Sequence, residues 1–359
     1  MDVLYGIPII GVLIQFIGYV VEVTPGIAPI VLGLAAPIAL GAMCGIMNER
    51  SGIVNIGIEG MMLSGAFAGF LVAGLVHQSM GPVEGFGPFG ITPALLAGVA
   101  AAIVVAMLLS ALHAWLSITI AADQIISGVI INVAALGLTG YLNRLLITPN
   151  PRLGAGTFST FRIPPELADF PVIGWILEMF LEQGPIAISV VAFVIVLQVL
   201  LFRSRWGLRT RAVGEHPRAA ETVGVNVVRM RYRNVIMAGI FAGLAGAYLT
   251  LEGTSSFQNG MTAGRGFIAL AAVIFGRWTP VGAFGAAVLF AYSGAFGQAI
   301  RIRPPGIEYP DLGAIVAAIP SQVYGSLPYI VTIVILAGVV GRSIPPAAVG
   351  RPYRKEEQT

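Results

Sequence analysis

Long stretches without a single charged residue limit what this chain can fold into. The 26 residues from Val23 to Asn48 carry no charge, and neither do the 24 residues from Gly60 to Val83. About 20 consecutive apolar residues are enough for a helix to cross the hydrocarbon core of a bilayer. Over the whole chain only 10% of the 359 residues are charged, against about 25% in soluble domains. The sequence therefore predicts an integral membrane protein.

The fold class follows from the solvent. Backbone groups inside a bilayer must hydrogen-bond within the protein, and the sequence shows no barrel-like alternation, so the spans are helices. We predict an all-α polytopic protein with about ten transmembrane helices, forming a single transmembrane domain over residues 1–359. The 46 glycines and 23 prolines indicate close helix packing and broken or re-entrant segments. The crossings are expected near 3–22, 27–47, 59–79, 92–115, 121–143, 184–202, 234–252, 266–277, 281–299 and 325–342.

The basic residues indicate the orientation. Eight of the twenty Lys and Arg residues lie between Arg203 and Arg233, and four more follow position 340. Because positive charge is retained on the inner side of a membrane, we expect the loop 203–233, the tail 343–359 and both termini to be cytoplasmic. The segment 147–183 is then external. Within it, FPVIGWILEMFLEQG is typical of an amphipathic helix lying in the membrane interface.

Residues 47–62, MNERSGIVNIGIEGMM, place charges between two membrane-length runs. A charge at the bilayer centre costs several kcal/mol, so these residues must face protein, water or the interface. One interpretation is a cytoplasmic turn with a solvated Glu49–Arg50 pair. The other is a re-entrant or unwound segment lining a polar cavity, which its apolar residues and its three glycines favour.

A weak internal repetition involves this segment. Residues 38–67 and 268–296 both begin with Ile-Ala-Leu, pass through a polar break containing an arginine and end in Ser-Gly-Ala-Phe. Interrupted segments at matching places in two halves are typical of transport pathways. Chance similarity between Gly- and Ala-rich helices is the alternative.

Other polar residues within the spans have structural interpretations. Asp123 is expected to cap the following helix rather than to bind a ligand. Asn132 is either an interhelical hydrogen-bonding residue or a contact for a solute, and the sequence leaves both open. Asn143 is expected to be structural. His77 and His113 are expected to be satisfied within the protein or interfacial.

The densest polar signal is the basic loop 203–233. Its charge alone is explained by cytoplasmic location and contact with anionic lipid, but its internal order is not. Pro217 suits the first turn of a short helix, Gly224 suits the position after its end, and Asn226 can cap a further helix. We interpret the short helix as a docking element for a cytoplasmic protein.

Several absences limit the chemistry. The only lysine is Lys355, so no phosphate-binding GxxxxGK[ST] loop is present. Cys44 is the only cysteine, which excludes an intramolecular disulfide and a cysteine metal cluster. We therefore expect no enzymatic activity, no metal site and no cofactor. Ion-coupled transporters often carry carboxylates in the middle of a membrane helix. Here the carboxylates lie near predicted helix ends, so the sequence gives no support for direct ion coupling.

The loop sequence GEHPRAAETVGVNV resembles the permease loop of ATP-binding cassette (ABC) importers. Arg218 stands where those loops usually have glutamate, which places the resemblance with the looser ribose/branched-chain type. NERSGIVNIGIEGMMLSGAF, ADQIISGVIINVAALGLTGYL and GFIALAAVIFGRWTPVGAFGAAVLF are similar to the nucleoside branch of that class, which is related to simple-sugar permeases. The resemblance covers about residues 30–340.

This resemblance implies the membrane subunit of an ATP-driven nucleoside importer. Its expected partners are an ATPase, often tandem-fused, a second permease subunit that is homologous or identical, and an extracellular or periplasmic binding protein. The implied pathway or gate residues are Asn48, Glu49, Arg50, Ser51, Asn55, Glu59, Asn132 and Arg277. The implied ATPase-coupling residues are Gly214, Glu215, His216, Pro217, Ala219, Ala220, Glu221 and Gly224.

Alternatives to a nucleoside importer belong to three classes. A simple-sugar importer of the same class has the same type of neutral polar pathway. An ion-coupled secondary transporter would work without an ATPase. A membrane scaffold or receptor component would not transport at all.

Overall fold

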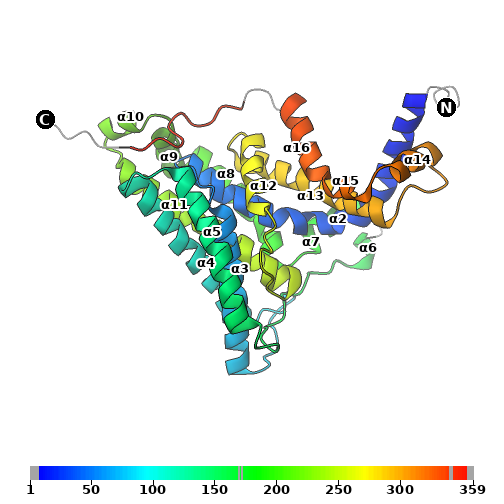
Figure 1. The fold of residues 1–359 in the computed structure, drawn as a ribbon, viewed down its shortest axis with the longest axis horizontal. Coiled ribbons are helices and arrows are strands. Elements are labelled where there is room, and N and C mark those ends of the chain that lie inside the picture. The colour runs from blue at the N-terminus through cyan, green and yellow to red at the C-terminus, as the bar shows by residue number, and fades with distance from the viewer. Residues whose placement is uncertain (1–7, 169, 171–172, 339–342, 354–359) are drawn as a thin grey trace. The chain divides into compact units, whose positions relative to one another are not determined.

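The computed structural model describes residues 8–168, 170, 173–338 and 343–353. Contacts divide the chain into two compact units. The first unit comprises Met1–Ala35, Arg162–Gln183 and Val288–Gly341, and the second comprises Ala36–Phe161, Gly184–Ala287 and Arg342–Thr359. Every named element within the described residues is a helix (Figure 1), which confirms the all-α prediction. That the whole chain acts as one transmembrane domain stays a prediction.

Two long helices contribute to both units: α2 (Pro8–Glu49) and α13 (Pro280–Ile302). The first unit also contains α6 (Pro165–Ala168), α7 (Ile173–Leu181), α14 (Pro310–Ala318), α15 (Ser321–Gly325) and α16 (Leu327–Gly338). The second unit contains α3 (Ile58–Met80), α4 (Pro93–Ala114), α5 (Gln124–Leu142), α8 (Pro185–Arg203), α9 (Arg205–Glu215), α10 (Pro217–Thr222), α11 (Val227–Ala247) and α12 (Arg265–Phe275). Short π-helical turns extend three of these helices: η1 (Trp115–Thr119), η2 (Asn143–Ile147) and η3 (Tyr248–Thr254).

Within the described residues, seven helices are long and apolar enough to cross a membrane. No turn separates the first two predicted crossings, because α2 is a single helix of 42 residues. Glu22 does not end that helix but pairs with Arg303 at 2.5 Å within the first unit. Beside Pro25 the Thr24 hydroxyl donates to the Val20 carbonyl and pairs with the Tyr292 hydroxyl of α13 at 2.7 Å. The expectation of about ten crossings stays a prediction.

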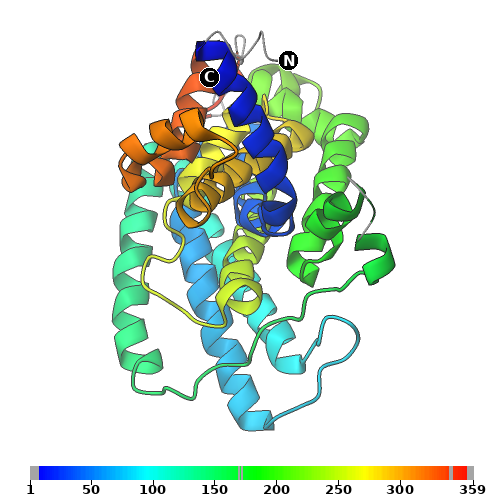
Figure 2. The ribbon, with the colours of Figure 1, turned by 90° about the vertical axis from the view of Figure 1, so that its right-hand side faces the viewer.

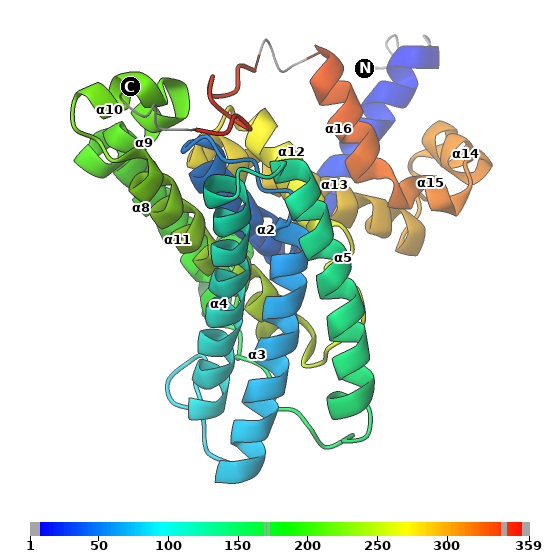
Figure 3. The ribbon, with the colours of Figure 1, turned by 60° about the vertical axis from the view of Figure 1, so that its left-hand side comes forward.

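Small residues bring the central helices of the second unit together. Figure 3 shows α3 between α4 and α5. A Cβ atom added at Gly243 of α11 would lie 2.5 Å from the Ile103 Cα atom of α4. One added at Gly246 would lie 2.3 Å from the Met62 carbonyl oxygen of α3. Such backbone proximity is how membrane helices gain van der Waals packing where lipid offers no hydrophobic driving force.

The first unit is held by aromatic and amide contacts around the N-terminal half of α2. Figure 2 shows α14 and α15, in orange, beside this dark-blue helix. The Gln15 side chain donates to the Asp311 carboxylate at 2.8 Å and accepts from the Leu312 amide at 3.0 Å. The Tyr19 ring packs edge-on against Phe296 and Tyr309, each with 5.9 Å between ring centroids. These contacts connect α2 to both α13 and α14.

Candidate functional site

The segment between α2 and α3, residues 50–57, is a buried non-helical break. Ser51 and Ile53 are completely buried, and Asn55 is 1% exposed. Glu49, the last residue of α2, is only 9% exposed. A solvated surface turn is therefore the wrong interpretation. The segment is unwound and buried, as the second interpretation requires, and a polar cavity lined by it stays a prediction.

Side chains from α4 and α5 satisfy the backbone of this break. The Val54 amide donates to Gln124 Oε1 at 2.7 Å, and the Val54 carbonyl pairs with His113 Nε2 at 2.9 Å. Because a carbonyl only accepts, Nε2 carries the proton, and Nδ1 accepts from the Ser127 hydroxyl at 3.0 Å. His113 is completely buried, so the prediction that it is satisfied within the protein is confirmed.

Asn132 on α5 spans the end of the break. Its Nδ2 donates to the Ile56 carbonyl at 3.0 Å, and its Oδ1 accepts from the Gly60 amide at 2.7 Å. Both polar groups of the amide are thus engaged by the chain itself. Of the two interpretations that the sequence leaves open for Asn132, the structure has the hydrogen bond between segments.

Glu59, in the first turn of α3, caps a different helix. Its two carboxylate oxygens accept from the backbone amides of Gly264, at 2.8 Å, and Gly266, at 2.7 Å. These amides belong to the N-terminus of α12, where unpaired N–H groups and the helix dipole favour a negative charge. Glu59 therefore joins the start of α3 to the start of α12.

The end of α2 grips the turn between α12 and α13. The Trp278 indole N–H donates to the Glu49 carboxylate. The Arg50 guanidinium donates to the Trp278 carbonyl at 2.9 Å and to the Arg277 carbonyl at 3.2 Å. The side chain of Arg277 is itself exposed, so this residue contributes its backbone to the contact.

The gripped turn is strained. Arg277 and Trp278 have φ values of 51° and 54°, and each non-glycine residue in this left-handed region costs about 1–3 kcal/mol. Such strain persists only where the surroundings determine the conformation. The bonds from Glu49 and Arg50 supply that constraint.

Glycines allow α2 and α12 to approach each other beside the break. A Cβ atom added at Gly41 would lie 2.9 Å from the Ala269 Cβ atom, and one added at Gly45 would lie 3.0 Å from Val273 Cγ2. The spacing of four residues on both helices makes this a small-residue packing seam. The helix–break–helix pattern of the sequence repetition is thus present twice, although an internal duplication stays a hypothesis.

Two buried polar atoms beside the break have no hydrogen-bond partner among the described residues: Asn48 Oδ1 and Gln124 Nε2. Since buried polar groups are nearly always paired, these two stand out in a region where the others are bonded. Asn48 is among the gate residues that the family resemblance implies, whereas neither Gln124 nor Trp278 was predicted to be a site residue. The only available signals were a polar residue at a helix start and a tryptophan beside an arginine.

The structure confirms the local order predicted for the basic loop. Pro217 is the first residue of α10, and Gly224, with φ of 84°, follows its end. The Asn226 side chain caps α11 by accepting from the Arg229 amide at 2.8 Å. The sequence did not predict α9, which begins after Ser204, whose hydroxyl accepts from the Gly207 amide at 3.0 Å.

Two of the predicted coupling residues are buried within the chain itself. Gly214 is buried, and Ala220 is 3% exposed in an apolar cluster with Val213 and Val227. An external partner does not reach them in this conformation, so their small size is required by internal packing. The solvent-accessible residues are Glu215, His216, Arg218, Ala219, Thr222, Val223 and Gly224.

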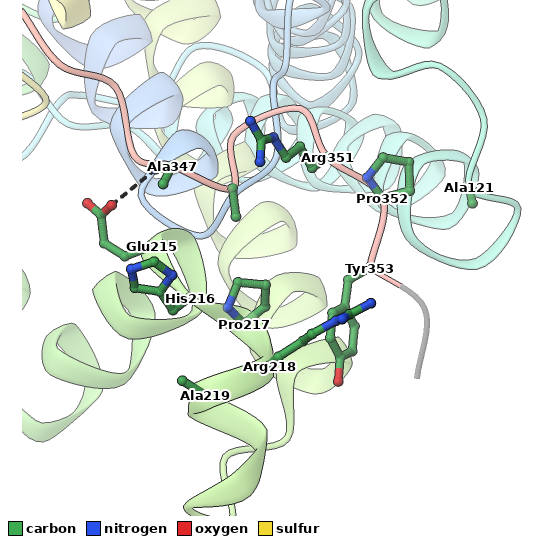
Figure 4. Close-up of a pocket in the computed structure, with 11 residues that line it drawn as sticks. Ala121, Glu215, His216, Pro217, Arg218, Ala219, Ala347, Arg351, Pro352 and Tyr353 are labelled. Carbon is green, nitrogen blue, oxygen red and sulfur yellow. Dashed lines mark hydrogen bonds between the residues drawn. The ribbon is translucent and has the colours of Figure 1, made fainter. Parts of the chain in front are cut away.

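The C-terminal tail lies beside α10. A pocket of about 790 Å³ lies between the two segments. It is lined by residues 215–219, Ala121, Ala347, Ala348, Arg351, Pro352 and Tyr353. Figure 4 shows Arg218 beside the Tyr353 ring. Burial, together with a hydrogen bond to Glu221, raises the pKa of the Tyr353 phenol to about 12, so it keeps its proton near neutral pH.

Cationic side chains gather where the loop meets the break. Arg50 and Arg211 lie on the Phe202 ring, with guanidinium carbons 5.5 Å and 5.1 Å from its centroid. Burial lowers the pKa of Arg50, and Glu215 opposes this shift while Arg211 adds to it. Cation–π attraction of both guanidinium groups to the Phe202 ring helps to offset the repulsion between these two positive charges.

The remaining sequence predictions concern caps and metals. The Asp123 carboxylate caps α5 by accepting from the Ile125 and Ile126 amides at 2.8 and 3.0 Å. Asn143 donates to Asn259 at 2.9 Å, which confirms its structural interpretation. Among the described residues no group of three His, Cys, Asp or Glu side chains could hold a metal ion.

Membrane-length helices, a buried polar break and an ordered basic loop define a polytopic membrane protein of the transport-permease kind. The model of one permease family, described as "Branched-chain amino acid transport system / permease component", matches residues 27–336. The chain belongs to this family. Membership in an ABC permease family implies, in general, an ATPase and a substrate-binding protein as partners.

Curated relatives share most of the chain. It is 37% identical over 344 residues to the guanosine ABC transporter permease protein NupQ of Bacillus subtilis, covering 94% of this chain and 98% of the relative. It is 33% identical to the nucleoside ABC transporter permease protein NupC of Lactococcus lactis, covering 90% and 95%. It is 32% identical to a putative glucose ABC transporter permease protein, TsgC13, of Haloferax volcanii, again covering 90% and 95%. No solved structure matches the chain significantly.

Proposed function

We propose that this chain is the membrane-spanning permease subunit of an ATP-driven importer that carries nucleosides across the cytoplasmic membrane. The observation that carries the proposal is its similarity to guanosine and nucleoside permeases over at least 90% of its length. The chain hydrolyses no ATP and binds no cofactor. A separate ATPase supplies the energy, and both termini and the loop 203–233 face that ATPase in the cytoplasm.

The buried break serves as the gate. Its neutral polar side chains are amides and the Ser51 hydroxyl, and its charged side chains, Glu49, Arg50 and Glu59, are hydrogen-bonded within the chain. Such a segment suits an uncharged polar solute. Asn48 Oδ1 and Gln124 Nε2, both buried and unpaired, offer an acceptor and a donor to such a solute. The gate comprises Asn48, Glu49, Arg50, Ser51, Asn55, Glu59, Asn132 and the turn at Arg277.

The short helix α10 is the ATPase-coupling helix. Between the buried residues Gly214 and Ala220, the exposed side chains available to a partner are Glu215, His216, Arg218 and Ala219. A binding protein on the outer side delivers the solute, and a second permease subunit, homologous or identical, completes the pathway.

A simple-sugar importer is the second candidate. It is favoured by the 32% identity to a putative glucose permease over 342 residues. A nucleoside contains a ribose, so hydroxyl recognition is common to both solute classes, and the base distinguishes them.

The test is uptake of labelled guanosine, uridine, adenosine, ribose and glucose by deletion cells and by cells complemented with this chain. Each uptake is repeated with an ATPase subunit made inactive by substitution of its P-loop lysine. Nucleoside uptake that requires both proteins supports the proposal. Uptake of sugar alone would replace the substrate class, and uptake that survives ATPase inactivation would contradict ATP-driven import.

A further inference from the structure

The C-terminal tail contacts the coupling helix, the break and α11 at once. We define residues 346–353 as the tail strap. The Ala347 amide donates to Glu215 at 3.0 Å, and the Ala348 amide donates to the Gly214 carbonyl at 2.9 Å. At its other end the Tyr353 hydroxyl donates to Glu221. The strap therefore contacts the coupling segment, residues 214–224, just before α10 and again near the end of that helix. The first residues of α10, Pro217 to Ala219, line the pocket between these two contacts.

The same strap reaches the break. The Gly350 amide donates to the Gly52 carbonyl at 3.2 Å. Gly52 has φ of 90°, and a Cβ atom there would lie 3.2 Å from the Ala348 carbonyl oxygen. A side chain at this point would be strained by the positive φ and crowded by the strap.

Arg231 of α11 completes the connection. This side chain is 1% exposed, its Nη1 donates to the Arg351 carbonyl at 3.1 Å, and its guanidinium lies 5.9 Å from the Tyr353 ring centroid. Its Nη2 would lie 2.6 Å from a Cβ atom at Gly52. Among the described residues no hydrogen-bond partner engages its Nε or Nη2, so hydrogen bonds to other groups do not explain its burial.

A buried guanidinium without full pairing is costly. The position of Arg231 accounts for a buried guanidinium here, because its side chain contacts the tail strap on one side and Gly52 of the break on the other. The coupling segment also meets the break directly, since a Cβ atom at Gly214 would lie 2.2 Å from the Arg50 carbonyl oxygen. The tail strap, the coupling segment, the break and α11 are thus connected by direct contacts.

We propose that the tail strap, with Arg231 as its positioning residue, fastens the coupling segment to the break so that a displacement of α10 is transmitted to the gate. This inference rests on the proposed function. It adds that the C-terminal tail, outside the transmembrane helices, determines how efficiently ATP hydrolysis drives transport.

The test uses the full complex of both permeases, the ATPase and the binding protein in proteoliposomes. The variants are a deletion of 346–359, Tyr353→Phe and Arg231→Met, and Arg231→Lys is the conservative rescue. The matched controls are a deletion of only 354–359 and Arg229→Met, which removes an exposed charge two residues from Arg231. We expect the ratio of nucleoside imported to ATP hydrolysed to fall at least five-fold in the three variants. The ratio should recover in part with Arg231→Lys and stay unchanged in the controls.

A second readout needs neither substrate nor ATPase. Ser51→Cys places a thiol at a completely buried position of the break, and the wild-type Cys44, also buried, gives the background. We expect maleimide labelling of this thiol to accelerate at least five-fold when residues 346–359 are deleted or Arg231 is replaced by Met. A matched melting temperature shows that the chain is still folded.

The outcomes are distinguishable. An intact complex that imports no nucleoside refutes the proposed function. An unchanged transport-to-hydrolysis ratio with unchanged labelling refutes the strap. Loss of ATPase co-purification in Tyr353→Phe and Arg231→Met also overturns it, because the tail would then be a docking element rather than a link.

Discussion

The cap that Glu59 provides for α12 leads to a quantitative prediction for Glu59→Gln. Two hydrogen bonds from backbone amides, at 2.8 and 2.7 Å, end on one carboxylate. Hydrogen bonds to a charged group contribute about 1.5–3 kcal/mol each. Glutamine keeps one acceptor oxygen but turns an NH₂ group toward the second amide, so one bond is lost and the other loses its charge. Loss of the favourable interaction between the carboxylate charge and the α12 helix dipole adds about 0.3–1 kcal/mol. We expect local opening at the start of α12 to become about 2–3 kcal/mol easier.

Hydrogen exchange measures this opening directly, because local unfolding determines the exchange rate of a protected amide. Since about 1.4 kcal/mol corresponds to a factor of ten, peptides covering residues 260–270 should exchange on the order of 30- to 150-fold faster in Glu59→Gln. The variant should still assemble with its partners, but its uptake should fall because the junction of α3 and α12 is loosened.

The same substitution at Glu84 is the control. Glu84 lies exposed in the loop between α3 and α4, so Glu84→Gln should leave exchange of 260–270 and uptake unchanged. Exchange in Glu59→Gln that is less than three-fold faster than in wild type would refute the capping argument. Normal uptake would show that the loosened junction has no part in transport.

Three further predictions follow from the packing. Trp278→Phe removes the indole N–H that donates to the buried Glu49, so the free energy of unfolding in detergent should fall by about 1–3 kcal/mol. Trp115→Phe, at a half-exposed site, should change it little, and equal effects would contradict the role of the Trp278–Glu49 hydrogen bond. Gly41→Ala places a Cβ atom 2.9 Å from the Ala269 Cβ atom and should destabilise the chain, whereas Gly26→Ala, whose Cβ atom has no neighbour within 4 Å, should stabilise it by up to about 1 kcal/mol. Melting-temperature shifts of the same sign in both variants would contradict close packing between α2 and α12. Ala220→Trp should destabilise the isolated chain by about 1–3 kcal/mol or more through overpacking. Ala219→Trp, on the exposed face of α10, should leave the melting temperature unchanged but lower the stimulation of the ATPase. An unfolded Ala219→Trp chain would contradict this, because Ala219 would then lie in the core.

Local signals predicted much of the local structure. Pro217, Gly224 and Asn226 marked the ends of α10 and α11 because a missing N–H, a left-handed conformation and a capping side chain each act within a few residues. Asp123 was identified as a cap for the same reason. The segment expected near 266–277 corresponds to α12, Arg265–Phe275, and the two charged residues Arg265 and Arg277 indicate that this helix is short.

Length and hydropathy were less reliable where a helix continues. Residues 3–22 and 27–47 were separated in the prediction, yet α2 runs through 8–49. Proline and a single glutamate weaken a span locally, but the hydrogen bond of Thr24 with Tyr292 and the ion pair of Glu22 with Arg303 connect this part of α2 to distant residues. Such compensation has no signal within the segment itself.

By itself the sequence determined that the chain is a helical membrane protein, that its polar break interrupts two membrane-length runs and that a short helix lies in the basic loop. Only the tertiary structure decided what the polar residues contact. Glu59 caps a helix that begins about 200 residues later, Glu49 pairs with Trp278, and the tail strap lies against Gly52 and Gly214. Hydrophobic length and capping act between neighbours in the chain, whereas the partner of a buried carboxylate or guanidinium is set by which helices pack together.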